Sequence, residues 1–330
     1  MAVTLNDSLK TASDPLAVGV IKNLLRQSDV LKLIPVQSLP GLRVRATRWQ
    51  TLPSTGTRKL SGTYTESTGA TEQVEETMSL YGGDITIDRI LAKVKGQLVD
   101  ELTNQTQMKS ASLAGTFNDS FINGDHAADP DVFEGLKKRV SNEPSRMTID
   151  LGSDALKVLA STANEHTFLD ALHEGVHKVR GGQQGNANIK GVMLMNEATF
   201  LGVGQVLRRV GLLATTKDAY ERTWDTFMGF ALVDVGLKND QSTEIIPATE
   251  EPGDGGADAT SIYVVRFGDD DGLHLIQLNG TSPAPYDPVK AGEGGATGPN
   301  YMRRIDWAIG LRSFGSYSIA RINGFKMAAS

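Results

Sequence analysis

The chain has 330 residues, of which 39% are hydrophobic and 22% are charged, with a formal net charge of −6 and no cysteine. This composition indicates a folded protein with a sizeable core, and it excludes disulfides, cysteine-zinc sites and thiol nucleophiles. The acidic balance, without any Lys/Arg cluster, argues against a protein that grips nucleic acid through its phosphates. The apolar runs are far shorter than the ~20 residues of a membrane span, and the polar stretch 1–10 lacks the pattern of a signal peptide.

The first 49 residues are predicted to form an N-terminal arm. Asp14 and Pro15 supply an N-cap and a first-turn proline for a helix that runs to about Gln27. After a proline- and glycine-rich break, residues 42–49 are predicted to form a strand. This strand carries three arginines, Arg43, Arg45 and Arg48.

Residues 50–83 are rich in Thr, Ser and Gly and hold few large apolar side chains, yet they retain strand-forming character. A polar two-stranded ribbon of this kind is marginal by itself in water. We therefore expect it to gain stability by lying on another subunit. Basic residues come early in the segment and acidic residues come late, so we expect intersubunit contacts from Arg58, Lys59, Glu66, Glu72, Glu75 and Glu76.

From Asp88 to Phe121 a one-sided apolar stripe predicts a helix roughly 50 Å long at ~1.5 Å per residue. Asn123 and Gly124 predict a left-handed stop after it. A helix of this length with one apolar face predicts a spine on which other elements pack.

Residues 146–280 alternate between helical and strand patterns. We expect helices over 154–179, begun by Ser153, and over 197–210, begun by Asn196. Segments 261–267 and 273–278 are predicted to form a hairpin, and 305–311 and 317–322 a closing strand pair. The Gly/Pro-rich stretches 247–260 and 280–300 are predicted to be long, contact-making loops.

The segment Phe121-Ile122-Asn123-Gly124-Asp125, followed by Phe133-Glu134-Gly135-Leu136, resembles the helix-end signature of tailed-bacteriophage major capsid proteins with the Hong Kong 97-type fold. Segments 304–310 and 320–322 resemble the closing strands of that family. In this comparison Phe121, Gly124, Phe133 and Leu136 form the corner at which the chain doubles back. The stretch 126–131 departs from the family's usual short Gly-rich linker, which puts the geometry of the corner in doubt.

The resemblance implies an α+β fold in four parts. These are an N-terminal arm (1–49), an extended loop (50–83), a peripheral domain with the spine helix (84–145 and 301–330) and an axial domain (146–300). It implies a non-enzymatic protein without cofactors, which self-assembles through pentamers and hexamers into an icosahedral head around double-stranded DNA. The implied partners are further copies, a scaffold, a portal and a decoration protein, with DNA packaged without sequence-specific contacts. The implied location is the virion, after assembly in the host cytoplasm.

Some shells of this fold are joined by an isopeptide bond between a loop lysine and an asparagine. Lys59 lies in the corresponding loop, and Asn300 or Asn323 would be the acceptor. No motif supports this pairing, so we do not expect a cross-link.

The main rival hypothesis is a zinc protease, because His173, Glu174 and His177 match the H-E-x-x-H pattern and Glu197 follows at the spacing of a third ligand. Glu197 comes after a predicted strand, however, where its carboxylate has an ordinary role at a helix N-terminus. The two histidines also flank the apolar stripe of their predicted helix. We therefore expect no metal at His173, His177 and Glu197. A second alternative is an encapsulin-type compartment, which shares the fold but encloses cargo enzymes.

Overall fold

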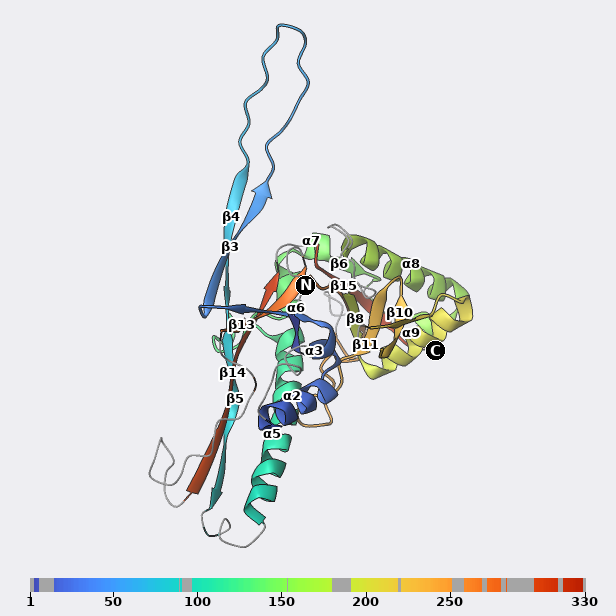
Figure 1. The fold of residues 1–330 in the computed structure, drawn as a ribbon. Helices are drawn as coiled ribbons and strands as arrows, with labels where there is room; N and C mark the ends of the chain where they lie inside the picture. The colour runs from blue at the N-terminus through green and yellow to red at the C-terminus, as the bar shows by residue number, and fades with distance from the viewer. Residues whose placement is uncertain are drawn as a thin grey trace.

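A computed structural model describes residues 3–5, 15–88, 90, 97–152, 154–179, 191–218, 221–250, 258–268, 272–279, 283, 300–313 and 317–328. Figure 1 shows a body of two packed parts from which a long ribbon projects. None of the helices in these ranges has an apolar stretch of the length that a membrane crossing requires.

The first part, the spine body, is a five-stranded sheet in the order β1-β2-β13-β14-β5. Its strands are β1 (Val3–Thr4), β2 (Pro35–Leu39), β5 (Ser79–Asp88), β13 (Leu273–Leu278) and β14 (Asn300–Ser313). The helix α5 (Gln97–Asn123) runs along the long β5–β14 pair (Figure 1). Phe117 of α5 lies 6.1 Å from Trp307 of β14, centroid to centroid, and both side chains are fully buried.

The expected spine helix is thus present but starts later than predicted. Asp88 ends a strand, and the stretch 91–96 lies outside the described residues. The buried stripe of α5 is formed by Leu113, Ala114, Phe117 and Phe121, whereas Met108, an apolar residue earlier in the same helix, is 59% exposed.

Residues 15–39, from the segment expected to form an arm, pack against the body of the subunit, whereas residues 43–49 belong to the projecting ribbon. The helices are α2 (Pro15–Gln27) and α3 (Asp29–Leu33), and Val20, Leu24 and Leu31 are buried with the aromatic residues of α5. Asn23 of α2 donates to the Gln107 carbonyl at 2.7 Å and to the Ser110 hydroxyl at 2.8 Å. The apolar side chains of α2 are therefore covered within the subunit.

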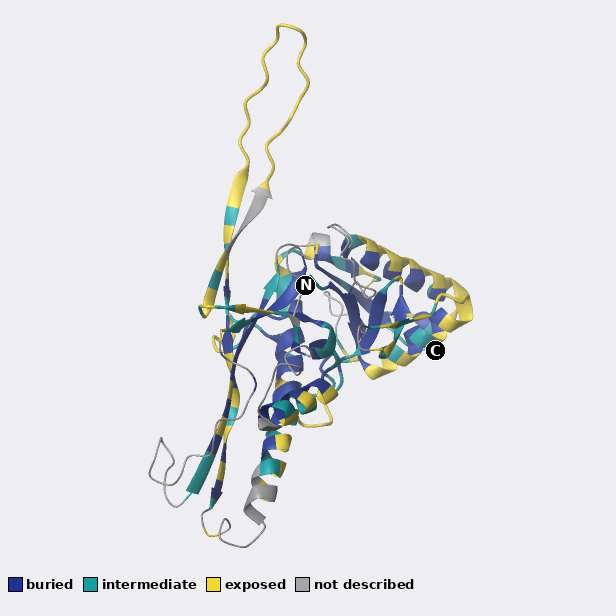
Figure 2. Cartoon of the chain, viewed as in Figure 1, coloured by how far each residue is buried: buried dark blue, intermediate teal, exposed yellow. Residues whose placement is uncertain are grey.

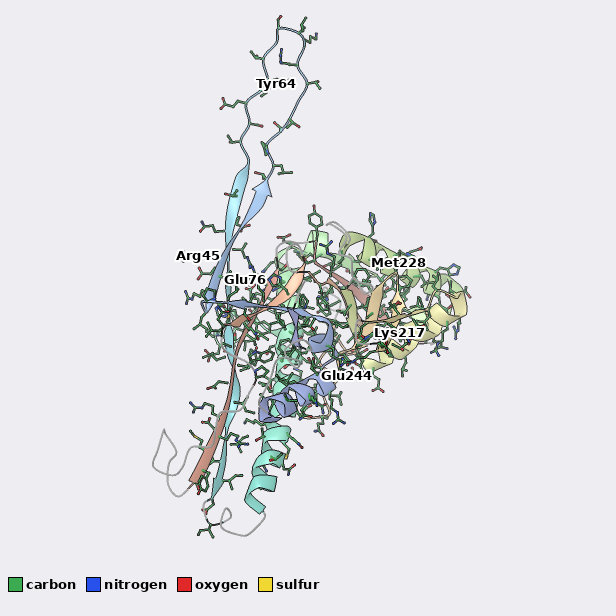
Figure 3. The ribbon with its side chains drawn as sticks, viewed as in Figure 1. Arg45, Tyr64, Glu76, Lys217, Met228 and Glu244 are labelled. Carbon is green, nitrogen blue, oxygen red and sulfur yellow. The ribbon has the colours of Figure 1, made fainter. Side chains whose placement is uncertain are left out.

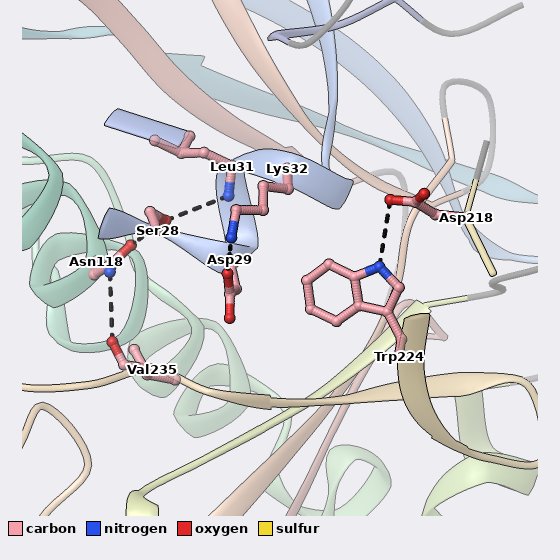
Figure 4. Close-up of polar contacts among 8 residues, drawn as sticks. All are labelled: Ser28, Asp29, Leu31, Lys32, Asn118, Asp218, Trp224 and Val235. Carbon is pink, nitrogen blue, oxygen red and sulfur yellow. Dashed lines mark hydrogen bonds and ion pairs between the residues drawn. The ribbon is translucent and has the colours of Figure 1, made fainter. Parts of the chain in front are cut away.

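A polar junction fixes α3 against both parts of the body (Figure 4). The Ser28 hydroxyl caps α3 by accepting from the Leu31 amide, and it donates to the side-chain Oδ1 of Asn118 at 2.6 Å. The side-chain Nδ2 of Asn118 in turn donates to the Val235 carbonyl at 3.4 Å. Because these groups are buried, each needs its partner to avoid an unsatisfied polar atom.

The second part, the mixed-sheet body, contains an eight-stranded sheet in the order β6-β15-β12-β8-β11-β10-β9, with β7 pairing β15. Its strands are β6 (Thr148–Asp150), β7 (Leu156–Lys157), β8 (Gly191–Met195), β9 (Ala214–Lys217), β10 (Thr223–Phe227), β11 (Phe230–Asp234), β12 (Thr260–Arg266) and β15 (Ile319–Lys326). The helices α8 (Thr162–Val179) and α9 (Glu197–Val210) pack on it with a short 3-10 turn, η1 (Val158–Ala160).

The central strands of this sheet are buried on both faces. Met193 and Met195 of β8 lie in the core under α8 and α9, while Val192 and Leu194 lie in the same core as α5. A strand covered on both sides has a continuous apolar sequence, which explains the uniform burial of β8 and β12. The sheet is therefore shared between the two parts of the body.

Strand pairing differs from the expected hairpins. β12 and β13 belong to different sheets, and so do β14 and β15. Segment 273–278, expected in an axial domain, therefore lies in the spine body, and β15, expected with the spine helix, lies in the mixed-sheet body. The physical reason is burial, because β12 and β15 are apolar on both faces and occupy interior positions of the larger sheet.

Of the two helices predicted in the mixed-sheet body, α9 begins where expected and α8 begins later. Asn196 caps α9 by accepting from the Thr199 amide, as the sequence indicates. The helix expected from Asp154 begins only at Thr162, because Leu156 and Lys157 pair with β15. Its start is instead capped by Ser161, whose hydroxyl accepts from the Asn164 amide at 3.2 Å.

A buried ion cluster joins the two parts. Glu250 accepts from Lys137 at 2.6 Å, from Arg321 at 2.9 Å and from the Ser261 hydroxyl at 2.6 Å. Burial by itself would raise the pKa of Glu250, but Arg321 and then the Lys137 and Ser261 contacts hold it below its ordinary value. The carboxylate is therefore charged at neutral pH and ties α6 (Leu136–Asn142) to β12 and β15.

Candidate intersubunit surface

A two-stranded ribbon leaves the body between β2 and β5. It consists of β3 (Arg43–Thr51) and β4 (Ala70–Thr77), paired antiparallel from Arg43 opposite Thr77 to Thr51 opposite Ala70. Every residue from 51 to 71 is exposed, as the yellow colour of Figure 2 shows along the projecting loop. Nothing in the described part of the subunit covers this segment.

The tip of the ribbon is a defined turn despite its exposure. The Gly62 amide donates to the Lys59 carbonyl at 2.9 Å, and Ser61 has a left-handed φ of 68°. This is the hydrogen bond and the third-position conformation of a type II turn. The Arg58 guanidinium lies 5.3 Å from the Tyr64 ring centroid, which adds a cation–π contact.

Large apolar side chains are exposed on this tip. Leu60 is 97% exposed, and Leu52 and Tyr64 are 73% and 66% exposed. Figure 3 shows Tyr64 far out on the ribbon and Arg45 at its base. Exposed apolar side chains along the projecting end of a ribbon, with Arg58 and Lys59 next to Leu60, have the character of an interaction site.

The acidic residues expected to contact another subunit occupy different settings. Glu66 is exposed near the tip, and Glu72 is half-buried on β4. Glu75 faces Arg43 and Arg45 of the paired strand, at 3.5 and 3.4 Å. Those contacts are exposed and stabilise little.

Glu76 differs from the expectation, because its carboxylate is buried and paired inside the subunit. Both oxygens accept from Arg139 of α6 at 2.7 Å, and this guanidinium also donates to the carbonyls of Glu134 and Leu311 at 3.0 Å. The side chains of Glu76 and Arg139 are only 9% and 10% exposed. The pair fixes the base of the ribbon to the body, so Glu76 is an internal anchor.

Beside this anchor lies a groove of about 570 Å³ between β4 and the segment 134–147. Carboxylates predominate among its charged groups, and Val74, Met147 and Ile319 add an apolar part. The charged lining residues are Arg43, Glu72, Glu75, Glu76, Glu134, Arg139 and Glu143, with His126 beside them.

The predicted corner residues meet where α5 ends. Phe121, Phe133 and Leu136 are fully buried, and Phe133 lies 5.7 Å from Tyr81 and 6.3 Å from Phe117 between ring centroids. Burial raises the pKa of Tyr81 to about 12. We infer that this cluster holds the returning chain against the sheet.

The helix stop works differently from the prediction. Gly124 does not adopt the left-handed conformation, and its amide continues the helical pattern to Ser120 at 2.9 Å. A Cβ at Gly124 would lie 2.4 Å from the Phe133 carbonyl oxygen, so glycine is needed for close packing. Residues 126–131, which differ from the family's Gly-rich linker, begin with a turn at Asp125. The Asp125 carboxylate accepts hydrogen bonds from the Ala127 amide and from the Lys138 ammonium. The Lys138 ammonium holds the pKa of Asp125 below its usual range.

Gly135→Ala is expected to destabilise the subunit, because the added Cβ would lie 2.6 Å from the Ser120 carbonyl oxygen and 2.7 Å from the Gly124 nitrogen. These are backbone atoms that no rotamer change can move, so we expect a loss of ~2–3 kcal/mol in the free energy of unfolding. Gly19→Ala, on an open face of α2 with no atom within 4 Å, is the control and should be neutral or stabilising by up to ~1 kcal/mol. Equal effects of the two substitutions in urea unfolding would contradict the role of Gly135.

The residues considered for zinc lie on the exposed outer side of the mixed-sheet body. His173 and His177 are exposed on α8, and the His173 ring packs edge-on against Phe227 at 5.1 Å. Glu197 is exposed in the first turn of α9. In the part of the chain that the structure describes, no three His, Asp or Glu side chains gather closely enough to hold a metal ion.

Comparison with known proteins shows which families share this architecture. The family model for major capsid protein GP7 matches residues 17–158, which run from α2 through the ribbon and α5 to η1. No curated protein matches the chain.

Similar solved structures cover nearly the whole chain at low identity. The holo-SrpI encapsulin complex of Synechococcus elongatus PCC 7942 is 12% identical with a TM-score of 0.61, over 90% of this chain and 87% of that one. The capsid of a native GTA particle is 14% identical with a TM-score of 0.56, over 90% and 89%. A chain of Mycobacterium phage Bobi is 10% identical with a TM-score of 0.55, over 89% of both. Residues 17–158 thus match the major capsid protein GP7 family, and the chain as a whole has the Hong Kong 97-type fold that these shell-forming proteins share.

Proposed function

We propose that this protein builds the icosahedral head of a tailed phage around double-stranded DNA, and that its ribbon holds neighbouring subunits together. The observation that carries the proposal is the ribbon itself. Residues 51–71 are exposed in the subunit and present Leu60, Leu52 and Tyr64 to solvent. Exposed apolar side chains of this kind mark a surface that another molecule covers in an assembly.

The proposed contact is heterologous, because the ribbon of one copy lies on a different surface of the next. Such head-to-tail contacts close into rings when the rotation between copies allows it. Pentamers and hexamers are therefore the expected intermediates. Arg58, Lys59, Glu66 and Glu72 are the proposed contact residues, with Glu75 at the edge and Glu76 as the anchor beneath them.

The net charge of −6 supports a container that does not bind its DNA tightly. An acidic wall repels DNA phosphates, and the packaged DNA is proposed to make no sequence-specific contacts with it. We propose that a separate portal and scaffold direct the filling and size of the head, with the virion as the final location and the host cytoplasm as the place of assembly.

An encapsulin-type compartment is the second candidate, because the SrpI encapsulin complex has a TM-score of 0.61 with this chain. The two functions differ in content. A head encloses DNA and is filled during infection, whereas a compartment forms around protein in an uninfected cell.

Electron microscopy of the purified protein tests the shell, and the content of nuclease-treated particles tests the function. For a phage head, particles from infected cells should retain DNA that resists nuclease, while particles from the protein expressed alone should be empty. Co-purification of one host enzyme inside particles formed without infection would favour the compartment. A protein that stays monomeric at high concentration and with crowding agents would contradict both.

We propose that no isopeptide bond joins the subunits, because no motif supports the pairing; of the two candidate acceptors, Asn300 is half-buried and Asn323 is only 8% exposed. A loop lysine from another copy would have to displace core contacts to reach Asn323. Boiled denaturing gels of shells should therefore show a single monomer band.

A further inference from the structure

We propose that Arg303 and Lys109 form a binding site for an oxyanion between the spine helix α5 and the β5–β14 pair. The site lies toward the end of this strand pair that points away from the ribbon (Figure 1). Phosphate ions and carboxylates share the ligand chemistry, because both offer paired oxygens to a guanidinium. A free ion and a carboxylate of a neighbouring copy are the two sources that the experiment below distinguishes.

Arg303 is a buried cation with little to compensate its charge. The residue is 6% exposed and lies on the face of β14 that also carries the buried Ile305 and Trp307. In the described part of the subunit its guanidinium makes one hydrogen bond, from Nη1 to the Thr106 hydroxyl at 3.4 Å, and its Nε is buried without a partner. A buried guanidinium without a counter-charge is unfavourable. An oxyanion beside Arg303 supplies both the charge and the acceptors.

Lys109 brings a second cation to the same side of α5. It follows Thr106 by three residues, and side chains so spaced on a helix are neighbours, with Cβ atoms ~5–6 Å apart. Its side chain fills the space that glycine leaves at position 83, where an added Cβ would lie 2.3 Å from the Lys109 Cε and 2.8 Å from its Nζ. Gly83 lies two residues before Ile85, which pairs with Arg303. The ammonium and the guanidinium therefore lie between the same strand pair and helix, one helical turn apart.

Asp84, next to Gly83 in the chain, does not neutralise these two cations. Both of its oxygens accept from Arg304, at 2.6 and 2.8 Å, and both side chains of that pair are on the exposed face of the sheet. Arg304 and, more weakly, Lys109 hold the pKa of Asp84 below its usual range. Three cations thus stand near one carboxylate that Arg304 already binds with both nitrogens.

A hollow of about 270 Å³ between β5 and α5 gives access to Lys109. Lys109 is the one cation of its lining, and Asp131 is the one carboxylate. The hollow is several times the ~30 Å³ that a water molecule occupies in the liquid, so an ion can enter it. Ile305 also lines it and lies two residues from Arg303 on the same face, ~7 Å along the strand. An ion that enters on Lys109 is therefore within side-chain reach of Arg303.

Inorganic phosphate tests the site on the full chain, at a protein concentration below that of shell formation. Relative to sodium chloride of the same ionic strength, ~50 mM phosphate should raise the Tm of the wild type by ~2–4 °C more than that of Arg303→Met. The comparison with the variant removes the general stabilisation that phosphate gives to folded proteins. In sodium chloride alone, Arg303→Met should be at least as stable as the wild type, because it removes a buried charge that has no counter-charge.

Three further variants separate the site from a general effect on folding. Arg303→Lys keeps the charge if the methionine variant fails to fold, and it should lose most of the phosphate-specific shift because lysine lacks the bidentate fork. Gly83→Ala displaces only the flexible end of Lys109 and should reduce the shift. Asp131→Asn is the matched control, because it removes the carboxylate of the same hollow and should leave the shift unchanged or make it larger.

Shell formation distinguishes the two sources of the oxyanion. A free ion gives the phosphate-specific shift described above. A carboxylate of a neighbouring copy gives no such shift, but Arg303→Met then raises the protein concentration needed for shells at least ~tenfold without making the free subunit less stable. This second arm rests on the proposed function, whereas the phosphate measurement does not need shells.

One result would overturn the site. If Arg303→Met responds to phosphate as the wild type does and also forms shells at the same concentration, Arg303 binds no oxyanion, while the shell function stands. A wild type that forms no shells would count against the proposed function, and the phosphate measurement alone would then decide the site.

Discussion

Replacing residues 52–69 with a two-residue Asn-Gly turn is expected to abolish shell formation and leave the subunit folded. Thr51 and Ala70 are paired across the ribbon, so a short turn that favours the hairpin geometry can connect them. No residue of the removed segment is buried, and we therefore expect the free energy of unfolding to change by no more than ~0.5 kcal/mol. Electron microscopy and size-exclusion chromatography measure assembly, and urea unfolding measures stability.

A control variant separates the length of the ribbon from its side chains. A Gly/Ser segment of the same length keeps the reach but removes Leu60, Arg58, Lys59 and Tyr64. We expect it to fail in assembly as well, because the contact depends on these side chains. Normal shells from the shortened variant would refute the proposed role of the ribbon, and normal shells from the Gly/Ser variant would limit that role to length.

Breaking the Glu76–Arg139 pair is expected to cost the most stability of any single polar substitution at the ribbon base. Glu76→Gln leaves a buried guanidinium without its bidentate partner, at contacts of 2.7 Å and with both side chains about one-tenth exposed. Removing one partner of a buried ion pair costs ~3–5 kcal/mol. Urea unfolding of the shortened-ribbon subunit, which we expect to be monomeric, measures the effect without interference from assembly.

Glu75 is the matched control because it is the neighbouring residue on the same strand and its ion pairs are exposed. Its contacts with Arg43 and Arg45 are at 3.4–3.5 Å, and those arginine side chains are more than 70% exposed. Glu75→Gln should therefore change the free energy of unfolding by less than ~1 kcal/mol. A Glu76→Gln variant as stable as Glu75→Gln would show that the buried pair does not anchor the ribbon.

Local signals in the sequence predicted those elements that depend on neighbouring residues. The helix α2 begins at Pro15 and ends at Gln27, and α9 begins after Asn196, as their caps and spacing indicate. The ribbon could be predicted because its sequence favours strands but is too polar to form a core of its own. These features depend on short-range chemistry that a sequence displays directly.

Features that depend on distant partners were not predictable in the same way. Nothing near Glu76 shows that Arg139, 63 residues away, takes both of its oxygens, so its anchoring role was missed. The glycine-rich link between β12 and β13 suggested a hairpin, but full burial of β12 requires neighbours on both sides, and β8 and β15 supply them. Ser161 is a residue type that caps helices, and its hydroxyl does so here. The apolar residues before it led to a predicted helix start that was too early.

The eight-stranded sheet has a mechanical consequence. Since β8 carries residues of both cores on its two faces, the halves of the body cannot hinge apart without exposing apolar surface on each side of the same strand. The subunit should thus melt in one cooperative step and behave as a stiff tile. In the proposed five-fold and six-fold rings, any difference in curvature would then be taken up by bending of the ribbon, and the body of every copy would stay alike.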